Sequence, residues 1–148
     1  MEMNKHGILE VGQKATLKKA ITQDDVAEYV NITGDTNPIF VDVDYSRRAG
    51  FEKPVVPPSL VFMILSNLLG TRLPGRGVTW LKGKTKFLKP VYPGEEITGM
   101  VEVTRVRPEK QLVNLKGVCT NAKGETVCET EVLMLAKDLE RVQDISRI

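Results

Sequence analysis

The most apolar stretch of the chain is PSLVFMILSNLLG, which occupies residues 58–70. Apolar residues fall on every side of the helix that this stretch would form, so we expect the helix to be buried on every side. In a chain of 148 residues only a curved sheet can wrap such a helix. Its apolar run, residues 60–69, is about half the roughly 20 residues that a bilayer crossing needs, so we expect no membrane span.

The second half of the chain predicts that sheet. Alternating polar and apolar residues between turn signals indicate four strands, at residues 78–88, 96–106, 112–120 and 126–136. Their order along the chain is typical of an antiparallel meander. Lys82, Lys84 and Lys86 alternate along the first strand, and the same alternation predicts Trp80 on their face.

The first half predicts a strand followed by two helices. Residues 12–21 mix apolar and basic side chains, and Thr22 can cap a helix that Gly34 ends. Val26, Tyr29 and Val30 share one face of that helix. A second, short helix is expected to follow residue 42 and to end near residue 49. Periodicity therefore predicts an α+β fold, an antiparallel sheet around one long central helix.

Composition limits the function classes. The chain is 41% hydrophobic, which suits one domain, and its formal net charge of +2 gives no bulk electrostatic reason to bind nucleic acid or an anionic membrane. Cys119 and Cys128 flank a turn and could face each other across a hairpin. Because the N-terminus shows no signal-peptide core, we expect free thiols and a cytoplasmic protein.

Two further stretches carry a more specific signal, GDTNPIFVD at residues 34–42 and FEKPVVPP at residues 51–58. They resemble the motif of the MaoC-like, (R)-specific enoyl-CoA hydratases, in which Asp, Asn-Pro and His stand in a tight loop and a His-Gly pair opens the central helix. The similarity covers roughly residues 8–136. It implies a single hot-dog domain over residues 1–148, with a charged tail at 137–148, that acts on acyl-CoA or acyl-carrier-protein thioesters without cofactor or metal.

The resemblance also implies roles for single residues. In the family, aspartate and histidine hold the water that adds to C3 of the enoyl thioester, and a backbone N–H at the helix start holds the thioester oxygen. The aspartate position is Asp35 and the loop asparagine is Asn37, but the histidine position is Phe40 and the N–H glycine is Pro58. Ser66 matches a helix serine thought to orient catalytic groups.

Two groups that perform the chemistry are therefore missing. Phenylalanine transfers no proton and proline has no N–H, although Ser59 could offer its own amide. The only histidine is His6, close to the N-terminus. Asp35 remains as a provisional catalytic group. The pattern resembles the substrate-binding subunits of heterodimeric 3-hydroxyacyl thioester dehydratases, so we expect an acyl-binding, non-catalytic or weakly active subunit, in a homodimer or in a heterodimer with a catalytic MaoC-like homologue.

Other interpretations stay open at this point. The chain could be a self-sufficient hydratase that uses Asp35, alone or with another polar group in place of the histidine. It could also be a hot-dog thioesterase or an acyl-CoA-binding regulatory module, because a fold does not fix a function. Asp35 could simply form a turn by bonding the N–H two residues on, Phe40 could fill the core, and Ser66 could bond the backbone one turn earlier.

Overall fold

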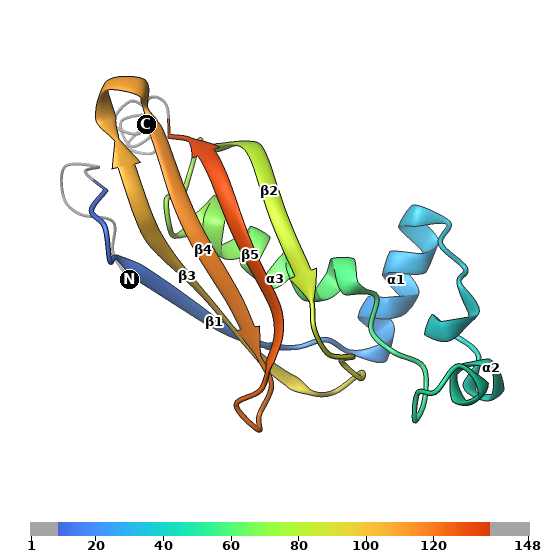
Figure 1. The fold of residues 1–148 in the computed structure, drawn as a ribbon. Coiled ribbons are helices and arrows are strands. Elements are labelled where there is room, and N and C mark those ends of the chain that lie inside the picture. Colours follow the sequence, from blue (N-terminus) through green and yellow to red (C-terminus); the bar gives the residue numbers. More distant parts are fainter. Residues whose placement is uncertain (1–8, 137–148) are drawn as a thin grey trace.

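The computed structural model describes residues 9–136, which form a five-stranded antiparallel sheet with a long helix across one face (Figure 1). The spatial strand order is β1-β3-β4-β5-β2. The strands are β1 (Lys14–Ala20), β2 (Thr79–Phe87), β3 (Glu96–Arg107), β4 (Leu112–Thr120) and β5 (Thr126–Leu135), and the helices are α1 (Gln23–Thr33), α2 (Val43–Arg48) and α3 (Pro58–Thr71). This confirms the predicted α+β arrangement.

Local signals place the helix ends where the sequence predicts them. The Thr22 side chain and Asp25 form a capping box at the start of α1, and Gly34 ends the helix in the left-handed conformation, with a φ of 71°. Asp42 caps α2 by accepting a hydrogen bond from the Tyr45 N–H. In Figure 1 α1 and α2 lie to one side of the sheet, next to the start of α3.

Two glycines allow α3 to lie close to the sheet. A Cβ atom on Gly99 of β3 would come within 2.6 Å of Cγ2 of Ile64, and one on Gly117 of β4 within 3.2 Å of Cδ1 of Leu65. Larger residues at these two positions would hold the helix away from the strands. The buried face of α3 consists of Val61, Ile64, Leu65, Leu68 and Leu69.

The expectation that α3 is buried on every side is wrong for the single chain. Phe62, Met63 and Ser66 are only half-buried, and Asn67 is exposed. The sheet covers one side of the helix and leaves this stripe open. Apolar composition around the whole helix therefore overstates its burial within one chain.

A bulge in β2 overturns the prediction for Trp80. The pairing of β2 with β5 shifts between Trp80 and Lys82, so Trp80 lies opposite the buried Met134. Its ring meets the ring of Phe62 on α3 edge-on, with 5.6 Å between centroids. Trp80 thus faces the helix, whereas the lysines at 82, 84 and 86 lie on the outer face, the side of the sheet away from α3.

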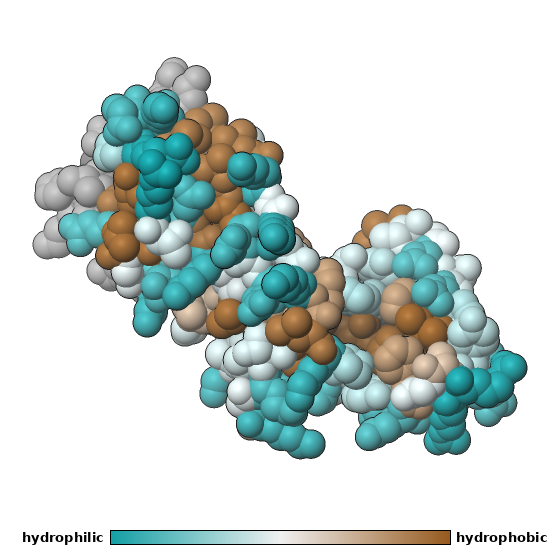
Figure 2. Space-filling model, in the orientation of Figure 1, coloured by the Kyte–Doolittle hydropathy of each residue, from teal (hydrophilic) through white to brown (hydrophobic). Residues whose placement is uncertain are grey.

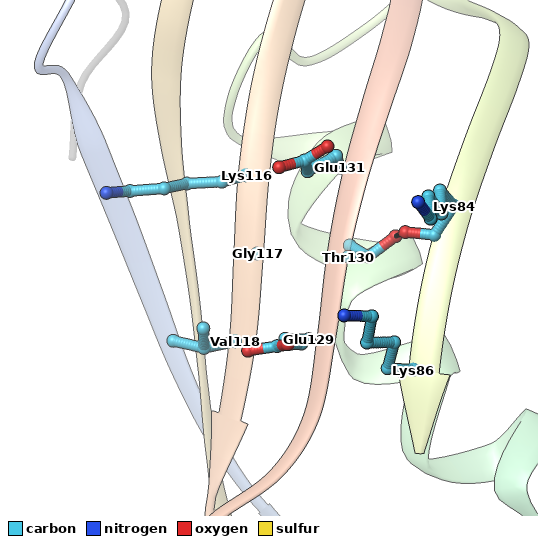
Figure 3. Close-up of a pocket in the computed structure, with 8 residues that line it drawn as sticks. All are labelled: Lys84, Lys86, Lys116, Gly117, Val118, Glu129, Thr130 and Glu131. Carbon is cyan, nitrogen blue, oxygen red and sulfur yellow. Dashed lines mark hydrogen bonds between the residues drawn. The ribbon is translucent and has the colours of Figure 1, made fainter. Parts of the chain in front are cut away.

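Opposite charges alternate across the outer face of all five strands. Along one row the residues in register are Lys14, Glu102, Lys116, Glu131 and Lys84, on β1, β3, β4, β5 and β2. The Glu102 carboxylate lies 3.4 Å from the Lys14 ammonium and 3.6 Å from that of Lys116. Figure 3 shows the second half of this charge row, with Glu131 between Lys116 and Lys84. The row ends in a lysine on the edge strand β2.

The remaining predictions about the chain concern thiols, membranes and termini. Cys119 and Cys128 lie directly opposite each other on β4 and β5, and both are buried and free, as predicted. Within residues 9–136, none of the helices has the length and hydropathy of a membrane span. His6 and the charged tail at 137–148 lie outside the described residues.

Candidate functional site

The loop after α1 is shaped by its own polar side chains. Asp35 Oδ1 accepts a hydrogen bond from the Asn37 N–H at 3.2 Å, and Asn37 Oδ1 accepts one from the Ile39 N–H at 3.3 Å. The second bond caps a short 3₁₀ helix at Pro38–Phe40. The turn-forming interpretation of Asp35 is therefore correct, and it occupies only one of the two carboxylate oxygens.

The second oxygen of Asp35 is bonded to a residue that the sequence did not single out. The Tyr29 hydroxyl, from α1, donates to Asp35 Oδ2 at 2.9 Å. This hydrogen bond and burial raise the pKa of Tyr29, while the nearby Ser59 hydroxyl lowers the pKa. Asp35, Tyr29 and Ser59 thus form a polar cluster, which joins α1, the loop and the start of α3.

The sequence predicts Tyr29 only as a member of the apolar face of α1, together with Val26 and Val30. The signal that could have revealed it is its spacing, because a tyrosine four residues before the last residue of α1 has a side chain long enough to reach a carboxylate just after the C-cap.

Backbone contacts hold the loop against the segment that leads into α3. The Ile39 carbonyl accepts hydrogen bonds from the Ser46 hydroxyl and from the Val55 N–H, both at 3.0 Å. The Val56 N–H in turn donates to the Val91 carbonyl at 2.7 Å. These bonds bring the GDTNPIFVD and PVVPP segments together, although the sequence separates them.

An apolar pocket of about 250 Å³ lies where the loop, the start of α3 and the end of β2 meet. Its wall includes Phe40, Phe51, Pro58, Val61, Phe87 and Leu88. The Phe40 side chain is 5% exposed and packs its ring edge-on against Tyr29, with 6.2 Å between centroids. Figure 2 shows apolar surface at the junction between the sheet and the α1–α2 lobe. Phe40 is thus both a packed aromatic and a wall of the pocket.

The start of α3 offers a backbone donor one residue later than the family motif. Pro58 is the first helical residue and has no N–H. The Leu60 and Val61 N–H groups donate to the Pro57 carbonyl at 2.9 and 3.4 Å. Ser59 therefore carries the first amide of the helix, and amides of a first helical turn have no partner inside the helix.

The structure separates the remaining candidates from this cluster. Ser66 lies seven residues after Ser59 on α3, which places it about 10 Å along the helix, on the open stripe. Asn37 is exposed, and its side-chain oxygen is used in the loop. The candidate site thus keeps Asp35, Phe40, Pro58 and Ser59, with Tyr29 added, and of these Phe40 and Pro58 line the pocket. Within residues 9–136 no cluster of His, Cys, Asp or Glu could hold a metal ion.

Comparison with known proteins identifies the family. The model of the FAS1-like dehydratase domain region matches residues 10–130. The (R)-specific enoyl-CoA hydratase of Aeromonas caviae is 39% identical over 107 residues, 72% of this chain and 80% of that protein. The (R)-specific enoyl-CoA hydratase of Rhodospirillum rubrum is 35% identical over 127 residues, 86% of this chain and 88% of that protein.

A solved structure agrees with these relatives. The (R)-hydratase from A. caviae involved in PHA biosynthesis superposes with a TM-score of 0.80 at 35% identity, covering 85% of this chain and 96% of that one. The likeness confirms the hot-dog fold, with the antiparallel sheet and the central helix in the same arrangement. The chain therefore belongs to the MaoC-like family of (R)-specific enoyl-CoA hydratases and 3-hydroxyacyl dehydratases.

Proposed function

We propose that this chain is an acyl-thioester-binding subunit of a MaoC-like hydro-lyase. In this proposal its own hydration of trans-2-enoyl thioesters is at least ~100-fold slower than that of a hydratase with an intact Asp–His pair, a size taken from one positioned acid or base. The assembly would interconvert trans-2-enoyl and (R)-3-hydroxyacyl thioesters without a cofactor. Its two free thiols fit the reducing cytoplasm.

The observation that carries the proposal is the apolar wall formed by Phe40 and Pro58. At these two positions a hydratase of this family would hold an acid–base imidazole and an amide donor. Here both contribute hydrocarbon to a pocket of about 250 Å³, and Asp35 lies outside its wall. An apolar pocket suits an acyl chain, because burial of the chain is favourable and the chain needs no hydrogen-bond partner.

The edge strand β2 supports a partner subunit. β2 is the outermost strand at one edge of the sheet, so one side of its backbone has no neighbouring strand. Three of its larger apolar side chains are exposed to different degrees, Trp80 at 37%, Leu81 at 50% and Phe87 at 50%. Pairing with a second edge strand would cover these side chains and would also shield the open stripe of α3 that Trp80 borders.

The charges on β2 favour a partner different from this chain. A two-fold axis near Gly83 would place Lys82 of one copy opposite Lys84 of the other, and like charges directly opposite destabilise a strand pair. The charge row across the sheet ends in Lys84 after alternating from strand to strand. A strand with carboxylates on its outer face would continue that alternation, so we assign the partner to a homologue with an acidic edge strand.

A hydration assay tests the catalytic half of the proposal. The purified chain is compared with the A. caviae hydratase on crotonyl-CoA, alone and after reconstitution with whatever subunit copurifies from the native host. We expect a slow isolated chain and a faster assembly. Full activity of the isolated chain that Asp35→Asn abolishes would replace the proposal with a self-sufficient hydratase, and release of free CoA thiol would replace it with a thioesterase.

Charge reversal tests the partner. Lys82→Glu, Lys84→Glu and Lys86→Glu together should abolish copurification. The matched control reverses three exposed lysines away from β2, at positions 19, 110 and 123, and so changes the net charge by the same amount. Retention of the partner by the β2 variant, or its loss in both variants, would contradict pairing through this edge.

A further inference from the structure

Both oxygens of the Asp35 carboxylate are already fixed by the protein. The Tyr29 hydroxyl donates to Oδ2 at 2.9 Å, and the Asn37 N–H donates to Oδ1 at 3.2 Å. A carboxylate held in this way has its orientation set before any ligand arrives, which is the condition that an effective base requires. The Asn37 bond is part of the turn itself, whereas the Tyr29 bond comes from a different element.

Tyr29 is in turn held from two sides. Its ring meets Phe40 edge-on, with an interplanar angle of 87°. Its backbone belongs to α1, which the capping box at Thr22 and the left-handed Gly34 fix at both ends. Phe40 occupies the position of the catalytic histidine. In this chain it packs against the ring of Tyr29, and Tyr29 holds Asp35.

The tyrosine also connects Asp35 to the start of α3. The hydrogen of the phenol goes to Asp35, and the Ser59 hydroxyl is near enough to the phenol to lower its pKa. Ser59 carries the first backbone N–H of the helix, because Pro58 has none. Tyr29 thus lies between the provisional base and the residue that carries the first amide of α3.

We propose that Tyr29 is the positioning residue of this site, which holds Asp35 beside Ser59 so that the two form the polar wall of the thioester site. The inference rests on the proposed function. Tyr29 does not transfer a proton itself, because the hydrogen bond to Asp35, followed by burial, raises its pKa and keeps the phenol protonated.

The first experiment measures the coupling without any substrate. The chain contains three tyrosines, so the phenolate absorbance of the chain minus that of Tyr29→Phe gives the titration of Tyr29 alone. Incorporated 3-fluorotyrosine brings all three titrations to lower pH, so that the measurement needs less alkali. Asp35→Asn should move the Tyr29 titration to lower pH. An unmoved titration would mean that the two side chains do not interact in solution, and the inference would then be wrong.

The second experiment measures function. Tyr29→Phe should lower kcat for crotonyl-CoA hydration about tenfold, the loss of one hydrogen bond to a charged group, with KM changed less than about twofold. The control is Tyr45→Phe, which removes a hydroxyl from an exposed ring, 42% accessible, on α2.

These two experiments separate the inference from the proposed function. If the titration of Tyr29 depends on Asp35 but the chain neither binds nor hydrates crotonyl-CoA, the proposed function is wrong. The hydrogen bond between Tyr29 and Asp35 then exists but does not belong to a thioester site. Intact binding and hydration in Tyr29→Phe overturn the inference alone. If Tyr29→Phe loses thermal stability as well as activity, the tyrosine has only a packing role. Tyr29→Trp, which has a bulkier ring and no phenol, should then show the same two losses.

Discussion

A Cβ atom on Gly99 would lie 2.6 Å from Cγ2 of Ile64, closer than two carbon atoms approach without a shift of one of them. The central helix therefore rests directly on the backbone of β3. We expect Gly99→Ala to lower the free energy of unfolding by about 1–3 kcal/mol, the range for an overpacked core. Urea denaturation, read from tryptophan fluorescence, measures the loss.

Gly70 provides the matched control for this prediction. It is the next-to-last residue of α3, and no atom lies within 4 Å of a Cβ built there. Gly70→Ala should raise the free energy of unfolding by roughly 0.5–1 kcal/mol, because alanine is the better helix former. Equal stability of Gly99→Ala and the unmodified chain would show that the helix can move away from the sheet at little cost.

The thiol pair beneath α3 should be unreactive in the folded protein. A hydrogen bond with Cys128, together with burial, raises the pKa of Cys119, whose side chain has no exposed surface. Because the thiolate is the reactive form, we expect no alkylation of Cys119 by iodoacetamide at neutral pH until urea unfolds the chain. Mass spectrometry of the quenched protein counts the labels. Rapid labelling under native conditions would contradict the burial of this pair.

Most of the fold was predictable because its signals are local. Thr22, Gly34 and Asp42 act on the backbone within a few residues of themselves, and the structure places the helix ends where they indicate. The strands of the second half likewise follow the alternation and the turn residues between them. The family motif also identified Phe40 and Pro58 as neighbours, and they share one pocket.

The features that escaped prediction depend on residues far apart in sequence or on a single irregularity. The bulge after Trp80 reverses its face, and strict alternation has no means of showing an inserted residue. The hydrogen bond between Tyr29 and Asp35 depends on the direction in which the chain leaves α1. The open stripe along α3 depends on how far the sheet curves, which the composition of the helix does not report.

Acid should weaken the start of α1. The Thr22 N–H donates to Asp25 Oδ2 at 2.9 Å, and this backbone hydrogen bond holds the pKa of Asp25 below its usual value. A carboxylate whose pKa is lower when folded stabilises the fold above its unfolded pKa, near 4, and loses that contribution as the pH falls through the folded pKa.

The measurement for α1 is urea denaturation at pH 7 and at pH 3, for the chain and for Asp25→Asn. The substitution should cost no more than about 1 kcal/mol at pH 7, because the carboxylate is partly exposed, and it should cost less at pH 3. A cost that is the same at both pH values would assign the stabilisation to the shape of the side chain rather than to its charge.

The last prediction concerns Phe40 and Pro58, the two motif positions at which apolar residues line the pocket. Phe40→His restores an imidazole, but at a position where the native Phe40 is only 5% exposed and packs against the Tyr29 ring. Pro58 still has no N–H to donate. We therefore expect Phe40→His alone to raise crotonyl-CoA hydration less than about tenfold. Pro57→His with Pro58→Gly restores the helix start but supplies no acid–base group at position 40, so its gain should be similarly small.

All three substitutions together should raise the rate at least ~100-fold, more than the product of the two separate gains, because a positioned base and an oxyanion donor act on the same transition state. Asp35→Asn in the triple variant is the control and should return the rate to that of the unmodified chain. If the gains simply multiply, the two positions act independently. If Pro57→His with Pro58→Gly adds nothing to Phe40→His, Ser59 already supplies the donor. If the triple variant gains nothing while it still binds crotonyl-CoA, the missing groups are not what limits this chain.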